Sequence, residues 1–298
     1  MTTLWRPRNA CGPHCLVAEE EAPPVRVRWR RFAGLLAAVA FGAALMPVLL
    51  CLSDAGRARA GRAWARLTLA ALGVDLRLRG RPPVTRALVV ANHVSWLDIA
   101  AIMAVAPGRM LAKAEVRRWP LVGALAAAAG TIFVDRSRPR TLPDTVAEVA
   151  AALRDGAVVA VFPEGTTGCG ADVGPFRPAM FQAAIDAGAA VVPVTLRYGT
   201  RAAAFVGDET LWASVRRVLA TPRLVASVTV APALHPEPAA SRRALARAAR
   251  SAVGTSGLPV PVPFRRRWHI AMYRVRLAAS ETGGTPWPAA GRSRSLRS

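Results

Sequence analysis

The sequence has little charge, almost no lysine and few of the signatures of common enzyme classes. Charged residues make up 19% of the 298 positions against 53% hydrophobic ones, which excludes an intrinsically disordered chain. A Walker phosphate-binding loop needs a lysine directly after a glycine. The only lysine, Lys113, follows an alanine, so this loop is excluded. No Gly-x-Ser-x-Gly and no His-Glu-x-x-His segment occurs, which weighs against α/β-hydrolase-type serine enzymes and zinc proteases.

The charge that is present is strongly positive. The 40 lysine and arginine residues outnumber 18 acidic ones, giving a net charge of +22. Such an excess favours anionic lipids, nucleic acids or acidic proteins without choosing among them. Only two tyrosines occur, and aromatic residues are not interleaved with basic ones as in base-stacking surfaces. We therefore expect no nucleic-acid partner.

Four cysteines, at positions 11, 15, 51 and 169, are too few for a disulfide framework in a chain of this length. The segment Cys11-Gly-Pro-His14-Cys15 has metal-ligating residue types, but no second ligand cluster follows it in the sequence. We predict a reducing compartment, ordinary thiols and no metal site.

The N-terminal part contains one apolar run long enough to cross a bilayer. Phe32 to Ser53 are 22 residues without a charge, and this run begins too late and is too long for a typical signal peptide. Arginines flank it on both sides, so the positive-inside rule does not orient a simple span. A kinked, re-entrant or hairpin anchor at Pro47 would keep both flanks on the cytoplasmic face. We predict a flexible basic arm over 1–31, and an anchor with an amphipathic helix (62–72) over 32–73.

From Val74 onward, apolar strand-like runs alternate with helical segments, which indicates an α/β layer fold. We place this domain at 74–263 and a basic, disordered tail at 264–298. The predicted strands are 74–79, 87–91, 110–114, 131–134, 157–162, 191–197 and 224–230. The predicted helices are 99–106, 121–129, 146–154, 179–187 and 240–253, with Gly156 ending the third of them.

The first candidate site follows the strand 87–91 and reads Asn-His93-Val-Ser-Trp-Leu-Asp98. A neutral histidine is the usual base for deprotonating a hydroxyl group. On one ideal helix, a spacing of five residues would separate the two side chains by about 140°, so they meet only if His93 lies in a loop and Asp98 in the first helical turn. Ser95-x-x-Asp98 is also a capping-box pattern, and Asp98 can serve in both roles.

Three further segments end or follow predicted strands, where an open α/β sheet presents its ligands. They are Gly-Thr-Ile-Phe-Val-Asp-Arg136, Phe-Pro-Glu164-Gly165-Thr166-Thr167, and Val-Pro193-Val-Thr-Leu-Arg-Tyr198. The residues themselves leave open whether the second is a surface loop or a site and whether the third is only a buried strand. An arginine such as Arg136 suits a phosphate ligand because its guanidinium binds in a bidentate manner.

Together, in this order and over about 89–198, the four segments resemble the four sequence blocks of the glycerolipid acyltransferases, the lysophosphatidic acid acyltransferases and their relatives. The resemblance implies a mixed α/β sheet flanked by helices, with an N-terminal membrane-docking helical segment. It implies that His93 and Asp98 are the catalytic pair and that Arg136 binds the phosphate of the acceptor. Glu164, Gly165 and Thr166 would then bind the acceptor and form the wall of the site, and Pro193 would serve donor binding or site architecture.

The sequence departs from this family at Thr167, where an arginine is common. Arg177 is a candidate to replace the missing cation, and the Gly-Thr-Thr form is similar to relatives that acylate lyso-ornithine lipid. The expected reaction moves an acyl group from acyl-CoA or acyl carrier protein to 1-acylglycerol-3-phosphate, without a metal or other cofactor, at the cytoplasmic face of the cell membrane. A catalytically silent lipid-binding module and a thioesterase are the alternatives.

Overall fold

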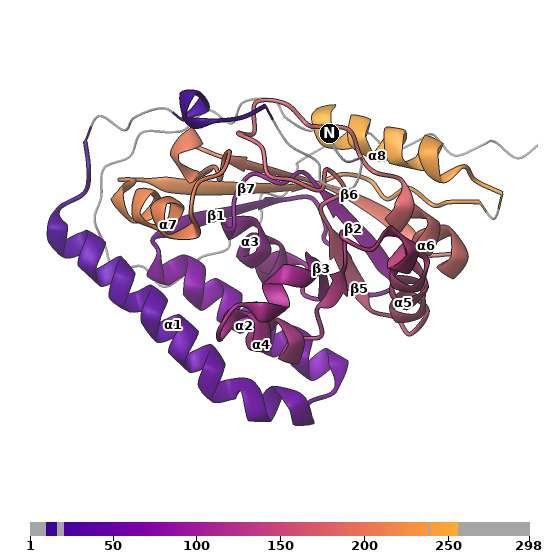
Figure 1. Ribbon diagram of the computed structural model, residues 1–298, viewed down its shortest axis with the longest axis horizontal. Coiled ribbons are helices and arrows are strands. Elements are labelled where there is room, and N and C mark those ends of the chain that lie inside the picture. The colour runs from indigo at the N-terminus through magenta and orange to yellow at the C-terminus, as the bar shows by residue number, and fades with distance from the viewer. Residues whose placement is uncertain (1–9, 17–20, 238, 256–298) are drawn as a thin grey trace, which may run out of the picture.

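A single mixed sheet of seven strands organises the protein (Figure 1). The computed structural model describes residues 10–16, 21–237 and 239–255. The strands lie in the order β1-β7-β6-β2-β5-β3-β4, and only the β6–β7 pairing is antiparallel. Their bounds are β1 Val74–Arg79, β2 Ala87–Ala91, β3 Arg109–Lys113, β4 Ile132–Val134, β5 Val158–Val161, β6 Ala190–Tyr198 and β7 Leu224–Val230. The predicted mixed α/β sheet is confirmed.

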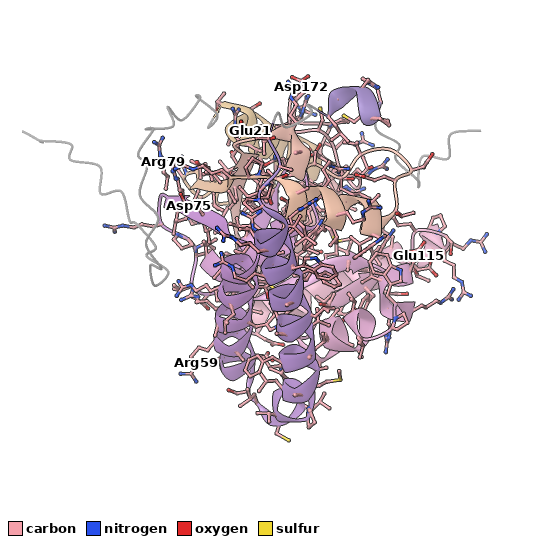
Figure 2. All side chains as sticks on the ribbon, turned by 90° about the vertical axis from the view of Figure 1, so that its left-hand side faces the viewer. Glu21, Arg59, Asp75, Arg79, Glu115 and Asp172 are labelled. Atoms are coloured by element: carbon pink, nitrogen blue, oxygen red, sulfur yellow. The ribbon has the colours of Figure 1, made fainter. Side chains whose placement is uncertain are left out.

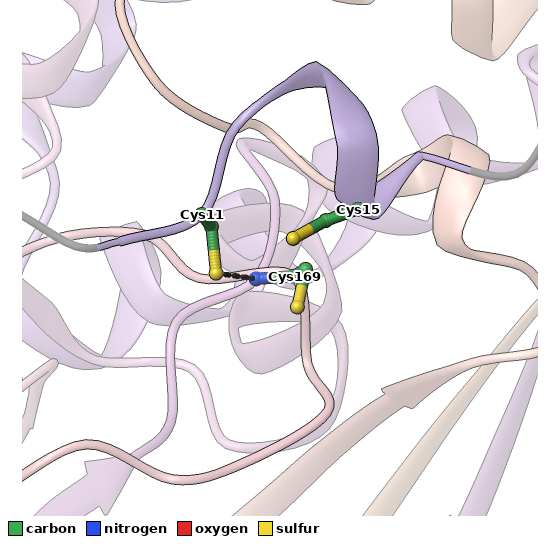
Figure 3. Close-up of side chains that lie close together, drawn as sticks. All are labelled: Cys11, Cys15 and Cys169. Carbon is green, nitrogen blue, oxygen red and sulfur yellow. Dashed lines mark hydrogen bonds between the residues drawn. The ribbon is translucent and has the colours of Figure 1, made fainter.

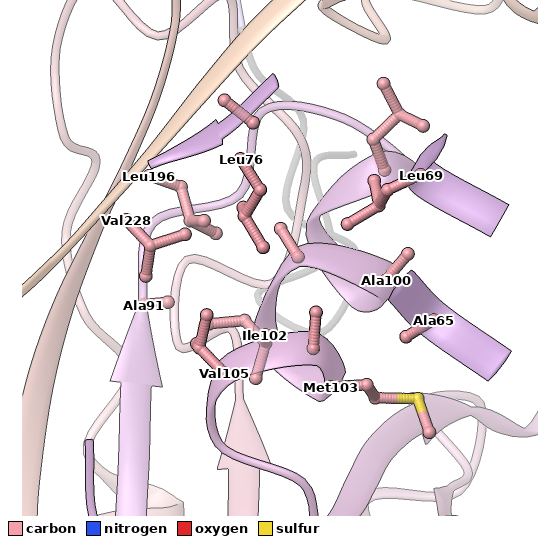
Figure 4. Close-up of a cluster of buried hydrophobic side chains, with 14 of the residues drawn as sticks. Ala65, Leu69, Leu76, Ala91, Ala100, Ile102, Met103, Val105, Leu196 and Val228 are labelled. Atoms are coloured by element: carbon pink, nitrogen blue, oxygen red, sulfur yellow. The ribbon is translucent and has the colours of Figure 1, made fainter. Parts of the chain in front are cut away.

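Helices cover both faces of this sheet. They are α1 Val25–Cys51, α2 Asp54–Ala71, α3 Leu97–Val105, α4 Val122–Ala128, α5 Leu142–Arg154, α6 Ala179–Ala187, α7 Leu211–Ala220 and α8 Arg242–Thr255. One apolar core joins α2, α3 and α7 to the sheet (Figure 4), and a second joins α5, α6 and α8 to its other face. β2 supplies Val89 to the first core and Leu88 and Val90 to the second, which explains its continuous apolar sequence.

The element order predicted from the sequence is confirmed for every strand and for five of the helices within this domain. Gly156 follows α5 with φ +90°, as a helix-ending glycine should. The prediction missed α7, although Thr210 caps it by accepting a hydrogen bond from the N–H of Ala213 at 3.2 Å. The tail 264–298 lies outside the described residues.

The apolar run forms the long helix α1, which pairs with α2 as a helical hairpin (Figures 1 and 2). The turn lies at Leu52–Ser53, whereas Pro47 stays inside α1, so the hairpin turns after the position at which the sequence analysis placed it. The Oγ atom of Ser53, the last residue of the apolar run, accepts a hydrogen bond from the N–H of Gly56 and so caps the start of α2. The Nε1–H of Trp64 on α2 donates to the carbonyl of Ala38 at 2.8 Å.

The sequence analysis predicted a flexible arm over 1–31, whereas the structure has helix in both parts of this segment that it describes. Residues 25–31 form the first turns of α1, and residues 13–15 form a short 3₁₀ helix. Arg31 fixes the start of α1, because its buried guanidinium donates to the carbonyls of Leu219, Thr221 and Pro222 around the end of α7. A cation at the carboxyl end of a helix also interacts favourably with the helix dipole.

Candidate functional site

The candidate site lies at the carboxyl ends of the central parallel strands. β2 lies between β6 and β5, and the chain leaves β2 through α3 to reach β3 beyond β5. The loops after β2 and β5 therefore diverge at a switch point, where open α/β sheets bind their ligands. The side-chain amide of Asn92 fixes the first loop by exchanging two hydrogen bonds with the backbone of Leu196 on β6, at 2.9 and 2.7 Å.

His93 and Asp98 meet in the arrangement that their spacing requires. His93 lies in the loop after β2, and Asp98 lies in the first turn of α3. The Nδ1 atom of His93 is 2.8 Å from Oδ2 of Asp98. The Asp98 side chain is fully buried, whereas 20% of the His93 side chain is exposed. Because Nδ1 faces the carboxylate, Nε2 is the ring nitrogen left to accept a proton from a substrate.

Asp98 is a heavily hydrogen-bonded buried carboxylate. Its Oδ2 also accepts the N–H groups of Val94 and Ser95 at 2.6 and 2.9 Å. Its Oδ1 accepts the hydroxyl of Tyr198, at the end of β6, at 2.6 Å. The predicted double role of Asp98 as helix cap and histidine partner is therefore present. These donors replace the water that a buried charge loses.

Tyr198 belongs to this network, and the sequence analysis did not single it out. Burial raises the pKa of its hydroxyl well above the ordinary value, and the negative charge of Asp98 acts in the same direction. The hydroxyl therefore stays protonated and remains a donor to Asp98. The only feature of the sequence that points to a role for Tyr198 is its position at the end of the fourth segment.

Replacing Tyr198 by phenylalanine is expected to lower kcat/KM about 10- to 100-fold, since a hydrogen bond to a charged group contributes about 1.5–3 kcal/mol. Because the hydroxyl contacts Asp98 and not a ligand, the loss should fall on kcat, with little change in KM. Steady-state rates and thermal unfolding measure both effects. An unchanged kcat together with a lowered melting temperature would instead indicate a purely structural role.

Glu164 ties the loop after β5 to the loop that carries His93. Its Oε1 accepts the backbone N–H of His93 and its Oε2 accepts that of Gly174, both at 2.9 Å. The residue is only 7% exposed. Burial raises the pKa of its carboxyl group, and the two N–H donors partly oppose that rise. Both oxygens accept backbone N–H groups, so Glu164 links the loop after β5 to the loop of His93.

The same loop supports the histidine ring and backbone. Phe162 stacks on the imidazole of His93, with ring centres 4.0 Å apart and an angle of 11° between the planes. The N–H of Gly168 donates to the carbonyl of His93 at 2.8 Å. Ring and backbone are thus both held by the segment that follows β5.

A cavity of about 730 Å³ adjoins this loop between β4, β5, α5 and α6. Most of its lining is apolar, and Phe162 and Gly165 form part of its wall. Arg136 and Arg177 both line it. Burial lowers the pKa of Arg136, the charge of Glu115 opposes this, and the charge of Arg177 adds to it. Arg242, Asp135 and Asp186 line the cavity as well, so its charged residues are three arginines and two aspartates, a balance that favours an anionic ligand.

The remaining predicted residues lie in the loop after β5 and on β6. The carbonyl of Gly165 accepts a hydrogen bond from the Nη1–H of Arg136, and Gly165 has φ +75°, which favours glycine. Thr166 and Thr167 follow in the same loop and are half-buried. Pro193 lies inside the sheet on β6, opposite Val90 of β2, so its place is in the architecture of the sheet.

Comparison with known proteins gives matches that cover the candidate site. Residues 76–197 match the family described as Acyltransferase. A 1-acyl-sn-glycerol-3-phosphate acyltransferase of Neisseria gonorrhoeae is 44% identical over 145 residues, 48% of this chain and 56% of that protein. A lyso-ornithine lipid O-acyltransferase of Pseudomonas aeruginosa is 38% identical over 221 residues, 70% of this chain and 83% of that protein.

The likeness extends to a solved structure. The crystal structure of the 1-acyl-sn-glycerophosphate acyltransferase PlsC from Thermotoga maritima matches with a TM-score of 0.62. The match covers 78% of this chain and 93% of that one at 19% identity, and so concerns the fold. The chain spans about half the length of the neisserial relatives that it matches.

Proposed function

Because the chain belongs to the acyltransferase family that includes these 1-acyl-sn-glycerol-3-phosphate and lyso-ornithine lipid acyltransferases, we propose that it acylates the free hydroxyl of a lysolipid. The preferred acceptor in this proposal is 1-acylglycerol-3-phosphate, which gives phosphatidic acid. The donor is the thioester of acyl-CoA or acyl carrier protein. The observation that carries the proposal is the His93–Asp98 pair, whose imidazole stacks on Phe162, a wall residue of the cavity that Arg136 and Arg177 also line.

The proposed mechanism is a direct transfer. Nε2 of His93 takes the proton of the acceptor hydroxyl, and Asp98 stabilises the resulting imidazolium. The acceptor oxygen forms a bond to the thioester carbonyl carbon, the carbon–sulfur bond breaks, and the departing thiolate receives the proton back from His93. No acyl-enzyme is proposed. Among the described residues, Cys169 is the cysteine nearest in sequence to these loops, and it contacts Cys11.

The direct test is acyl transfer by the purified protein in lipid vesicles. Lysophosphatidic acid and lyso-ornithine lipid are offered separately, each with acyl-CoA and with acyl carrier protein. Product from lysophosphatidic acid supports the preferred acceptor. Free fatty acid released without an acceptor would indicate a thioesterase, and no product from any pairing would indicate a silent lipid-binding module.

Arg136 is proposed to bind the phosphate of the acceptor, with Arg177 supplying the second cation in place of an arginine at Thr167. The variant Arg136→Ala is expected to raise the KM for lysophosphatidic acid about 10- to 100-fold, because a charge-assisted hydrogen bond contributes about 1.5–3 kcal/mol. The KM for a lysolipid without phosphate should change much less. Steady-state rates with both acceptors measure this difference.

Arg138→Ala is the matched control for this prediction. Arg138 lies two residues further along, and its side chain is 78% exposed beside Asp135. Its replacement should leave both KM values near the wild-type values. Equal losses for both acceptors in Arg136→Ala would contradict a phosphate-specific role.

Lyso-ornithine lipid is the second candidate acceptor. The relative from Pseudomonas aeruginosa matches over 83% of its own length, further than the neisserial relatives do. Thr167 is the residue that favours this candidate. Product from lyso-ornithine lipid alone would keep the mechanism and change the acceptor.

We also propose that α1 docks the protein on the cytoplasmic face of the membrane. The helix is long and apolar enough to cross a bilayer, and only 11% of its most apolar stretch is buried. Large apolar side chains on α1 are exposed, namely Val25, Trp29, Leu36, Phe41, Val48 and Leu50. Helix α2 packs against both α1 and α3, so its arginines lie alongside α1. We infer that the hairpin of α1 and α2 contacts the membrane through its outer face.

A further inference from the structure

Three cysteines from distant parts of the chain meet beside the catalytic loops (Figure 3). Cys11 precedes the short 3₁₀ helix of residues 13–15, Cys15 is the last residue of that helix, and Cys169 lies in the loop that follows Glu164. Their three sulfur atoms all lie within 4.8 Å of one another. The sequence analysis expected ordinary thiols because no second ligand cluster follows Cys15, and Cys169 is 158 positions from Cys11.

The spacing and the geometry fit a thiolate metal centre. Structural zinc sites use pairs of cysteines separated by two to four residues, and Cys11 and Cys15 are separated by three. Zinc–sulfur bonds of about 2.3 Å place tetrahedral sulfur ligands about 3.8 Å apart, so the sulfur atoms need to approach by at most about 1 Å. A disulfide would join two of the sulfur atoms and leave the third unused, whereas a metal ion uses all three.

The surroundings of the sulfur atoms also suit thiolate ligands. The backbone N–H of Cys169 donates to Sγ of Cys11 at 3.3 Å, the type of outer hydrogen bond that supports a ligating sulfur atom. Apolar side chains of Val94, Ala204 and Val206 pack against the group on one side, while Cys11 and Cys15 stay half-buried, so a water molecule can reach the fourth position.

We propose that Cys11, Cys15 and Cys169 bind one soft divalent metal ion, zinc by its preference for thiolates, with a water molecule as the fourth ligand. The three thiols release their protons when the metal binds, and no redox step is involved. The ion joins the segment 10–16 to the loop that contains Gly168, whose N–H holds the carbonyl of His93 at 2.8 Å. The metal therefore has a structural role next to the catalytic histidine, and the site does not depend on which lipid is acylated.

The test begins with the metal content of the full chain, purified in detergent without chelators from cells supplied with zinc. We expect about one zinc ion per chain, because three thiolates in a folded site bind zinc tightly. Each of Cys11→Ser, Cys15→Ser and Cys169→Ser should retain less than about a tenth of that amount. Cys51→Ser is the matched control, since Cys51 is exposed at the end of α1, and it should retain the full amount.

A second measurement needs no variant and so avoids the risk that a variant misfolds. Wild-type protein loaded with cobalt should show sulfur-to-cobalt charge-transfer absorption in the near ultraviolet and the strong visible bands of tetrahedral cobalt. Wild-type protein that binds neither zinc nor cobalt would overturn the proposal. So would equal zinc in the wild type and all three serine variants, which places the metal elsewhere, or a disulfide between two of the three cysteines in freshly isolated protein.

Discussion

Replacing His93 by alanine is expected to lower kcat about 10²–10⁴-fold with lysolipid and acyl donor, the usual contribution of a general base. We expect the variant to keep its fold, because the His93 ring is partly exposed and stacks on a single aromatic neighbour, Phe162. The loss should therefore appear in kcat, with little change in the melting temperature. Initial rates of diacyl product, measured at saturating acceptor, give the value.

The matched control is His235→Ala. His235 is exposed in the segment after β7, away from the catalytic loops, and its variant should retain the wild-type rate. Asp98→Asn should lower kcat strongly as well, since a neutral amide beside Nδ1 of His93 cannot stabilise the imidazolium as the carboxylate does. A His93→Ala enzyme with full activity would remove His93 from the mechanism.

The pairing of His93 with Asp98 could be predicted because its geometry is local. A histidine at the end of a strand can meet an aspartate five residues later when a helix begins between them, and the structure places α3 there. Most strands could likewise be predicted as short apolar runs bounded by turn residues, and β1 by its alternation of apolar and charged residues. Local sequence was sufficient for these features.

Contacts between distant segments could not be read in the same way. Tyr198 reaches Asp98 across 100 positions because β6 pairs with β2 in a register that only the folded sheet fixes. The cysteine cluster depends on residues 10–16 packing against Val94 and Val206, which no sequence period announces. The direction in which α1 and α2 pair follows from packing, such as the Trp64 contact with Ala38, rather than from the proline in α1.

Replacing Glu164 by glutamine is expected to lower the free energy of unfolding by about 2–4 kcal/mol. The amide has one oxygen, so it can accept from the N–H of His93 or from that of Gly174, and its NH₂ group must face the other. One buried donor is then left without an acceptor. Thermal unfolding followed by tryptophan fluorescence measures the loss, and Glu148→Gln, an exposed position on α5, is the control expected to show none.

The same substitution separates two roles for Glu164. If the carboxylate holds the loop of His93 in place, Glu164→Gln should lower kcat about 10²-fold, the effect of misplacing a catalytic group by about 1 Å. If it instead binds the acceptor, as the family resemblance implies, the variant should raise the KM and leave kcat and stability unchanged. The structure favours the first result, because both carboxylate oxygens are occupied by backbone N–H groups and the residue is 7% exposed. A rise in KM alone would require one of those oxygens to leave its N–H donor when the lysolipid binds.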